Sequence, residues 1–237
     1  MKSAGCTDIF YGIETGSPEM QAAINKHLDL EDAFNKIVIT QKLGIQVTAS
    51  FIIGFPQERI SSLSETVNLF LKLRILMPRL YNLQIHLLTP MINTEITEEY
   101  WDSISWDEHY TAFYALTKMT KWERKQVRFD KKIFSSYYHF TNSEVTRSIY
   151  KLLHWVLLYS YAYPVFFRLL DMHLYGQTGQ QLINWAAQEG DALFQWVRLF
   201  SCNLPAIISL PELHHRSASR YSSCTAPSKN ESSGIFS

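Results

Sequence analysis

Cysteine is scarce in this chain, and its positive and negative charges cancel. The three cysteines, Cys6, Cys202 and Cys224, are odd in number and fit neither a disulfide framework nor a zinc-ligand spacing. This pattern favours a reducing, intracellular setting. Lysine and arginine total 22, and aspartate and glutamate also total 22, so the net charge is zero. A neutral chain gives no electrostatic argument for a nucleic-acid partner, and we expect none.

A long uninterrupted apolar run is also missing. The most apolar stretch, residues 152–170, contains Pro164 and Arg168, whereas a membrane-spanning helix needs about 20 mostly apolar residues. Two interpretations stay open for it: a packed pair of helices, or a helix lying at a membrane interface. The first residues are polar, so we expect no signal peptide. The expected location is therefore cytoplasmic, with peripheral membrane contact through the C-terminal helices as the alternative.

What the chain does contain is a regular alternation of strand and helix patterns. Period-two alternation predicts three strands, at residues 8–14, 46–53 and 81–88. Helix-start signals follow at Ser17–Pro18, at Asp29 and, as a capping-box pattern, at residues 62–65. This order implies parallel β/α units. The predicted fold class is α/β, a partial (β/α) barrel fragment of about three parallel strands with helices, followed by an α-helical C-terminal extension.

Each predicted strand has one apolar face and one mixed face. In a barrel, one strand face packs on the outer helices and the other looks inward. The mixed faces carry Glu14, Ser50, Ile52, Gln84 and His86. A face this polar is unusual for a filled core, and ligands of α/β proteins lie at the carboxyl ends of the strands. The pattern therefore predicts a polar-ligand site on this face.

The sequence changes character near residue 98. Residues 1–98 contain the predicted half-barrel. Residues 99–205 are expected to be mainly helical, with a long apolar stretch from residue 142 to about residue 174 and another helix at 180–202. Residues 206–237 are rich in serine and poor in apolar side chains, which predicts a disordered tail.

Three segments at the predicted strand ends carry a family resemblance. Residues 11–17 (Tyr-Gly-Ile-Glu-Thr-Gly-Ser), 51–58 (Phe-Ile-Ile-Gly-Phe-Pro-Gln-Glu) and 87–90 (Leu-Leu-Thr-Pro) resemble the fourth, fifth and sixth barrel strands of the radical S-adenosylmethionine (radical SAM) superfamily. They are most similar to the branch whose members carry an N-terminal cobalamin-binding domain. The resemblance covers about residues 1–95.

The resemblance implies an enzyme that binds S-adenosylmethionine near a [4Fe–4S] cluster. Reductive cleavage of the cofactor would give a 5′-deoxyadenosyl radical, used by the parent enzyme as a methyltransferase, a cyclase or a related modification enzyme. Cobalamin is implied as a further cofactor of the full-length parent. The cofactor-binding residues implied on this chain are Gly12, Glu14, Thr15, Ser17, Ser50, Ile52 and Gly54.

Several of these residues have a structural alternative beside the functional one. Glu14 would accept hydrogen bonds from a ribose hydroxyl or the cofactor's ammonium, or it would form an ion pair or cap a helix end. Ile52 would pack on adenine or belong to the core, and Ser17 would contact the ribose or cap the following helix. Gln84 and His86 are the candidates for contact with a small-molecule substrate. The apolar C-terminal extension would suit a hydrophobic substrate.

The sequence also departs from the superfamily it resembles. The Cys-x3-Cys-x2-Cys loop that holds the cluster is missing, and the spacing of the three cysteines cannot replace it. No catalytic residue and no metal ligand is therefore identifiable on this chain. We expect a C-terminal fragment of a longer enzyme, inactive by itself in radical chemistry.

Two other functional classes stay open. A different (β/α) barrel enzyme would need a Schiff-base lysine or a cluster of metal ligands at the strand ends. The chain has no lysine at the three predicted strand ends, and His86 is the only histidine well placed for a role there. A non-catalytic scaffold at a membrane edge would instead use the aromatic helices after Tyr138.

Overall fold

The computed structural model describes residues 1–76, 82–106, 119–160 and 177–185, together with residues 167, 169, 172, 187 and 188. The chain divides into two units, Met1–Arg198 and Leu199–Ser237. The second unit lies outside the described residues, and so do the predicted tail at 206–237 and most of the predicted helix at 180–202.

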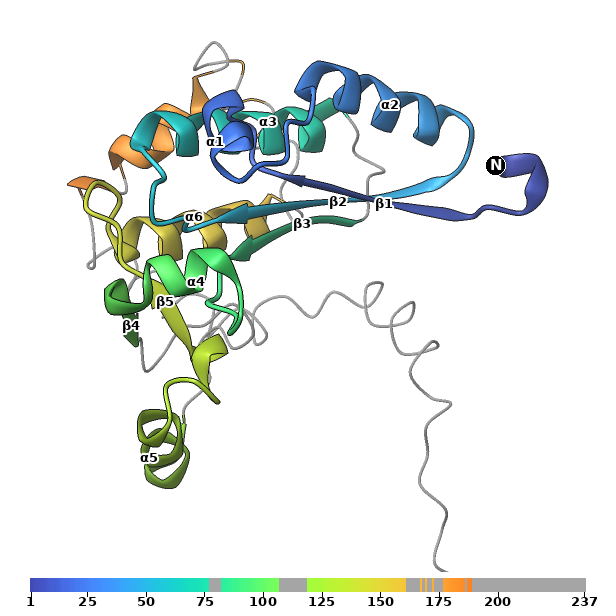
Figure 1. Ribbon diagram of the computed structural model, residues 1–237. Helices are drawn as coiled ribbons and strands as arrows, with labels where there is room; N and C mark the ends of the chain where they lie inside the picture. Colours follow the sequence, from blue (N-terminus) through green and yellow to red (C-terminus); the bar gives the residue numbers. More distant parts are fainter. Residues whose placement is uncertain are drawn as a thin grey trace, which may run out of the picture. The chain divides into compact units, whose positions relative to one another are not determined.

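A three-stranded parallel sheet forms the centre of the first unit. Its strands are β1 (Asp8–Glu14), β2 (Gln46–Ile53) and β3 (Asn82–Leu87), in the order β1-β2-β3 (Figure 1). Helices connect consecutive strands, as parallel pairing requires. The predicted mixed α/β class, with three parallel strands flanked by helices and a helical C-terminal part, is confirmed.

The helices between the strands begin and end at recognisable signals. After the short 3₁₀ turn η1 (Lys2–Ala4) and strand β1, helix α1 (Pro18–Ala23) has proline at its first position. Helix α2 (Leu30–Lys42) begins after Asp29, whose carboxylate accepts the Asp32 N–H. Gly44, with a φ of 73°, allows the chain to turn into β2.

Helix α3 (Ile60–Leu76) starts earlier than the sequence predicts. The capping-box pattern suggested a start at Ser62, but the Ser62 hydroxyl bonds both the N–H and the C=O of Arg59 at 2.9 Å. Ser62 therefore lies inside the first turn of α3, and its side chain bonds the backbone of Arg59 where the helix begins. The predicted capping box is wrong at this helix.

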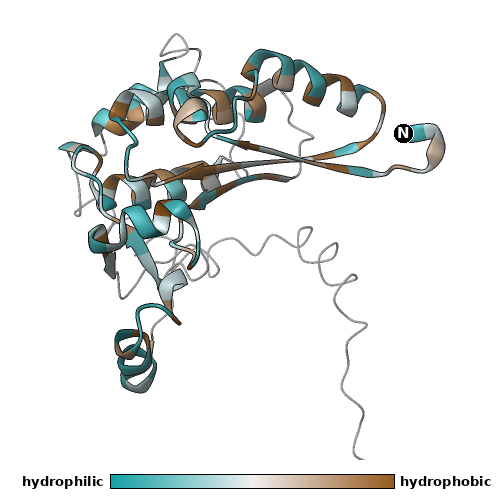
Figure 2. Ribbon diagram, viewed as in Figure 1, coloured by the Kyte–Doolittle hydropathy of each residue, from teal (hydrophilic) through white to brown (hydrophobic). Residues whose placement is uncertain are grey.

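The apolar sheet face and the helices share one core. Figure 1 shows α1, α2 and α3 on one side of the sheet, and Figure 2 shows the strands as predominantly hydrophobic. Phe51 of β2 meets Phe70 of α3 edge to face, with ring centroids 5.6 Å apart. Burying two such side chains stabilises the fold by roughly 2–3 kcal/mol each. The other buried members of this sheet face are Val47, Ala49, Ile53, Leu83, Ile85 and Leu87.

Helix α6 (Arg147–Tyr159) belongs to the same core. Leu152, Leu153 and Leu157 are fully buried there, and Nε2 of His154 donates to the Ile85 carbonyl of β3 at 3.1 Å. Residues 152–154 and 157 of this apolar stretch are thus packed in the core, while most of the rest of the predicted helix pair lies outside the described residues. Within the described part of the chain, no helix is long and apolar enough to cross a membrane.

Between β3 and α6 lies a small antiparallel strand pair that the sequence analysis missed. Strands β4 (Ile104–Trp106) and β5 (Tyr138–Phe140) pair over only three residues each, too short for an alternation signal. The helices in the described part of this region are α4 (Glu95–Glu99), η2 (Trp101–Ser103), α5 (Lys121–Phe129) and η3 (Ser135–Tyr137). The predicted domain boundary at residue 98 stays a prediction.

Candidate functional site

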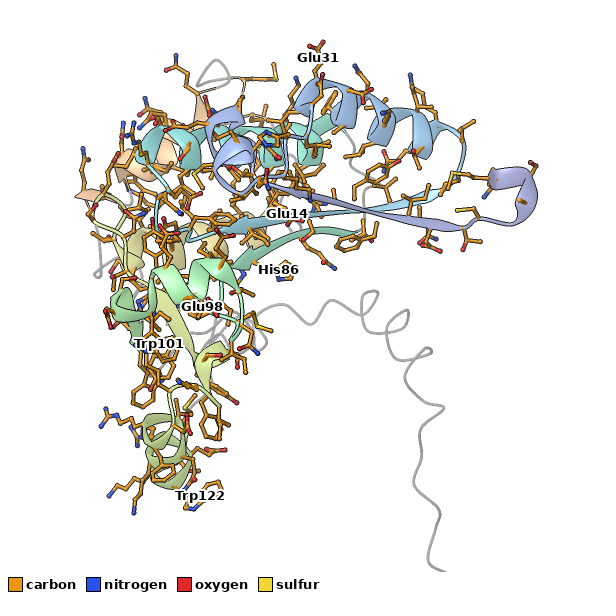
Figure 3. All side chains as sticks on the ribbon, viewed as in Figure 1. Glu14, Glu31, His86, Glu98, Trp101 and Trp122 are labelled. Carbon is orange, nitrogen blue, oxygen red and sulfur yellow. The ribbon has the colours of Figure 1, made fainter. Side chains whose placement is uncertain are left out.

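Cross-strand register aligns the mixed strand faces into rows. Gly12 lies beside Ser50, and Ser50 lies beside Gln84; one step further, Ile52 lies beside His86. Directly paired residues project from the same face of a sheet. We call the surface formed by these five residues the open face. Figure 3 shows His86 extending from β3 on the side away from α2 and α3.

The end of β1 is bent out of regular strand geometry. The register shifts between Gly12 and Glu14, and Glu14 has a φ of 65°. The Thr15 N–H donates to the Ile13 carbonyl at 2.9 Å, which closes a three-residue turn around Glu14. A positive φ costs a non-glycine residue about 1–3 kcal/mol, and such strain clusters at functional sites. Because of this bend, the Glu14 side chain leaves the backbone in a direction that it would not take in a regular strand.

Glu14 forms an ion pair above Gly12. Its Oε1 lies 2.8 Å from Nζ of Lys26, and both side chains remain partly exposed. A Cβ added at Gly12 would lie 2.5 Å from Glu14 Oε1 and 3.0 Å from Lys26 Nζ. The missing side chain of Gly12 thus makes room for this pair on the open face. The partner of Glu14, Lys26, follows helix α1 in the chain.

The rest of the open face offers polar groups to solvent. Gln84 and His86 are exposed, Ile52 is half-buried and Ser50 is buried. His86 Nε2 and Gln84 Oε1 lie 3.3 Å apart, so the two side chains contact each other. The open face, together with Glu14 beside it, therefore places a carboxylate, an imidazole, an amide and an aliphatic side chain on three adjacent strands.

Thr15, Gly16 and Ser17 face helix α3 and the protein interior. Thr15 is 0% exposed, and its hydroxyl bonds Thr66 Oγ1 at 2.9 Å. The Gly16 N–H donates to the same Thr66 oxygen at 3.0 Å. Ser17 precedes α1 but makes no side-chain cap, so the predicted cap is wrong; its hydroxyl is buried without a hydrogen-bond partner. In this structure neither hydroxyl reaches the open face.

A buried amide that the sequence analysis missed holds the turn after β1. Gln21 Nε2 donates to the carbonyls of Ile13 and Thr15 at 2.7 and 2.8 Å. Its Oε1 accepts the Leu28 N–H at 3.3 Å. The amide therefore fixes the backbone on both sides of Glu14. Its position in the first turn of a short helix gave no sequence signal for this role.

The loop after β2 is closed by Glu58. Gly54 has a φ of 97°, and its N–H donates to Glu58 Oε2 at 2.8 Å. Glu58 is 1% exposed, and its other oxygen is buried without a hydrogen bond of normal geometry, as is the nearby Tyr150 hydroxyl. Burial raises the pKa of Glu58 to about 7, although the Gly54 N–H and Tyr150 partly oppose the rise. Through the bond to Gly54, Glu58 orders the loop after β2.

Asn142 clamps the same loop from outside, which the sequence analysis also missed. Its Nδ2 donates to the carbonyls of Phe55, Pro56 and Glu58 at 3.1, 3.1 and 2.7 Å. Its Oδ1 accepts the N–H groups of Glu144 and Val145, both at 2.8 Å. One side chain thus joins the loop after β2 to the segment that leads into α6.

The raised pKa of Glu58 predicts a pH-dependent stability. Above pH 7 the folded protein must hold a buried carboxylate, whereas the unfolded chain ionises near pH 4.5. Stability from this group is therefore present at low pH and lost as pH rises to about 7. Glu58→Gln is expected to raise the free energy of unfolding by about 3 kcal/mol at pH 8, and by little below pH 4.5.

Urea unfolding of both proteins between pH 4 and pH 8.5 measures this difference. Burial lowers the pKa of His154 to about 4, which acts in the opposite direction below pH 6.5. Because His154 is the same in both proteins, the difference between them isolates Glu58. A difference that stays constant with pH would contradict the prediction.

The described residues provide no metal centre. No group of three or more histidine, cysteine, aspartate or glutamate side chains in them could hold a metal ion. Cys6 is partly buried, and its sulfur contacts the Asp8 carbonyl at 3.6 Å. Cys202 and Cys224 lie outside the described residues. The residues described here therefore do not fit an iron–sulfur cluster.

Comparison with known proteins gives one partial match and no family assignment. No family model matches the sequence. A protein of Pyrococcus horikoshii named uncharacterized methyltransferase is 33% identical over 75 residues, which is 32% of this chain. The match spans 16% of that relative's own length. The chain is thus similar over about a third of its length to a small part of a protein named as a methyltransferase.

Proposed function

We propose that this chain carries the nucleoside-binding half of an S-adenosylmethionine site, on part of a radical SAM-type barrel. The observation that carries the proposal is the strained Glu14 at the end of β1, whose carboxylate lies over the bare backbone of Gly12. The similarity to a protein named as a methyltransferase supports a cofactor of this class. So do the three parallel strands, since ligands of such folds lie at their carboxyl ends.

The open face supplies contacts that suit each part of the cofactor. The Glu14 carboxylate would accept hydrogen bonds from the ribose hydroxyls or pair with the amino-acid ammonium, in place of Lys26. Half-buried Ile52 would pack on the adenine ring. Gly12 leaves backbone accessible to the ligand, whereas Gly54 is buried and its N–H is bonded to Glu58. Ser50 would contribute a hydroxyl between them, while Thr15 and Ser17 would support the turn from behind.

Radical chemistry needs groups that these residues do not supply. A [4Fe–4S] cluster would cleave S-adenosylmethionine by electron transfer, and cobalamin would accept or pass on a methyl group in the parent enzyme. The described residues do not fit a cluster, so we assign no reaction step to them. Gln84 and His86 remain the proposed contacts for a small, hydrophobic substrate.

Calorimetric titration of the full chain with S-adenosylmethionine tests this proposal. Glu14→Gln is expected to weaken binding about 10- to 100-fold, because a charge-assisted hydrogen bond contributes about 1.5–3 kcal/mol. Glu31→Gln is the matched control, since Glu31 is an exposed carboxylate on α2, away from the open face (Figure 3). Equal effects of the two substitutions would overturn the proposed role of Glu14.

The variant Lys26→Met tests whether the cofactor's ammonium binds Glu14. If the cofactor's ammonium replaces Nζ of Lys26 at Glu14, removal of this competing cation is expected to strengthen binding of S-adenosylmethionine. Adenosine, which lacks the ammonium, separates the two possible contacts. Weaker adenosine binding by Glu14→Gln would assign the carboxylate to the ribose, whereas unchanged adenosine binding would assign it to the ammonium.

A further inference from the structure

Positive charge is concentrated on α5 and the residues that follow it. Residues 121–132 contain six basic and two acidic side chains, in a chain whose net charge is zero. Lys121, Arg124, Lys125 and Arg128 recur at helical spacing and therefore share one face of α5. Together with Phe129 they line an open depression of about 550 Å³. We call these five residues and Trp122 the α5 surface.

The side of α5 that carries Val127 is anchored to the β4–β5 pair, and Arg128 of the basic face reaches the same pair. Val127 is buried, and its carbonyl accepts the Tyr138 hydroxyl at 3.1 Å. Arg128 lies over the Trp106 ring, 4.6 Å from its centroid. A capping box between Thr120 and Glu123 fixes the first turn. The helix is thus held in one orientation about its axis, with Lys121 and Lys125 directed away from Val127.

Two large aromatic side chains accompany the exposed lysines. Trp122 is 69% exposed and Phe129 is 83% exposed. They are seven residues apart, which places them on the same side of the helix, next to Lys121 and Lys125. Figure 3 shows Trp122 on the side of α5 away from β4 and β5. Exposing both rings to water is unfavourable, so their position indicates a surface that contacts something apolar.

We propose that the α5 surface docks on a bilayer containing anionic lipid. The lysines would pair with headgroup phosphates, while Trp122 and Phe129 would enter the boundary between headgroups and acyl chains. A nine-residue helix is only about 13 Å long, which makes it a short contact surface. Single-stranded nucleic acid also contacts cations and rings, but it is bound along a groove several nucleotides in length. This inference is independent of the proposed S-adenosylmethionine site.

Vesicle flotation of the full chain tests the inference. The chain is expected to float with vesicles of phosphatidylcholine and phosphatidylserine in a 70:30 ratio, and not with phosphatidylcholine alone. The double variant Lys121→Glu/Lys125→Glu is expected to bind at least tenfold more weakly, because each basic residue strengthens binding about fivefold. Lys36→Glu/Lys42→Glu on α2 is the matched control, with the same change in charge at exposed positions.

A second double variant separates the contribution of the aromatic rings to vesicle binding from the contribution of the charges. Trp122→Ala/Phe129→Ala is expected to bind anionic vesicles at low salt and to lose binding at high salt more readily than the unaltered chain, because its remaining attraction is screened. Circular dichroism confirms that each variant is folded. The inference is overturned if the unaltered chain ignores anionic vesicles, if the α2 control loses as much binding, or if single-stranded RNA binds the α5 surface more tightly than the vesicles do.

Discussion

Asn142→Ala is expected to lower the free energy of unfolding by about 3 kcal/mol or more. The substitution removes the donors for three loop carbonyls and the acceptor for two N–H groups. Each intramolecular hydrogen bond contributes about 1 kcal/mol net, and partners left buried without a replacement cost more. Urea unfolding monitored by circular dichroism measures the loss. No other polar side chain among the described residues joins the loop after β2 to the chain before α6 through as many bonds.

Two further variants distinguish the clamp from a general effect of truncation. Asn142→Asp keeps the acceptor for Glu144 and Val145 but sets a carboxylate against the carbonyls of the loop, so it is expected to destabilise nearly as much. Asn35→Ala, at an exposed position on α2, is expected to be neutral or slightly stabilising. Hydrogen exchange of residues 54–58 should accelerate in both Asn142 variants. Unchanged exchange there would show that the clamp does not order the loop.

The clamp connects two parts of the chain that the sequence suggests are separate. The loop it holds follows Ile52, which belongs to the proposed nucleoside site, whereas Asn142 lies beyond the predicted boundary at residue 98. Leu152, Leu153 and Leu157 of α6 complete the core behind the same sheet. Order at the carboxyl end of β2 therefore depends on residues far along the chain. A shortened chain that stops near residue 98 would lose both the hydrogen bonds of Asn142 and the α6 side chains that pack against the sheet.

The sheet could be predicted from sequence because its signals are local. A strand repeats every two residues, so the period of Gln46–Ile53 fixes both its limits and the side chains that face the helices. The same alternation in β3 predicts Gln84 and His86 on the face opposite the core. Helix α2 was predictable for a similar reason, since Asp29 and Gly44 mark its ends within the sequence itself.

The contacts that shape the candidate site could not be predicted, because they join residues distant in sequence or depend on backbone geometry. The positive φ of Glu14 follows from the bulge between β1 and β2, which alternation does not encode. Gln21 and Asn142 bind backbone carbonyl groups. Every residue has such a group, so the sequence does not show which ones these side chains bond. The contact of Thr15 is of the same kind, since its hydroxyl bonds Thr66 of α3, which is distant in sequence. The cofactor contact predicted for Thr15 stays a prediction.

Gly16→Ala is expected to destabilise the protein by about 3 kcal/mol. A Cβ at Gly16 would lie 2.7 Å from the Glu65 carbonyl oxygen and 2.8 Å from the Thr66 Cα. Both are backbone atoms of α3, so no rotamer change can relieve the overlap. The turn after β1 would have to move away from α3, which would also stretch the bond from the Gly16 N–H to Thr66. Thermal and urea unfolding measure the loss.

Gly12 and Gly44 supply controls, because alanine at these positions is expected to destabilise the protein for other reasons than at Gly16. At Gly12 an added Cβ meets only the ends of the Glu14 and Lys26 side chains, which can swing away, so Gly12→Ala is expected to cost less than about 1 kcal/mol. At Gly44 no atom lies closer than 4.0 Å, and the φ of 73° alone predicts a cost of about 1–2 kcal/mol for Gly44→Ala. Equal losses at Gly16 and Gly12 would refute close packing of the turn on α3.

Thr66→Val tests the same contact from the helix side. Valine keeps the shape of threonine but removes the oxygen that bonds both the Thr15 hydroxyl and the Gly16 N–H. With those two groups left buried, a loss of about 1–3 kcal/mol is expected. If the turn serves mainly to position Glu14, both Gly16→Ala and Thr66→Val should weaken binding of S-adenosylmethionine beyond what their loss of folded protein explains. Gly16 would then act in the candidate site through packing alone, by holding the turn that carries Glu14 against α3.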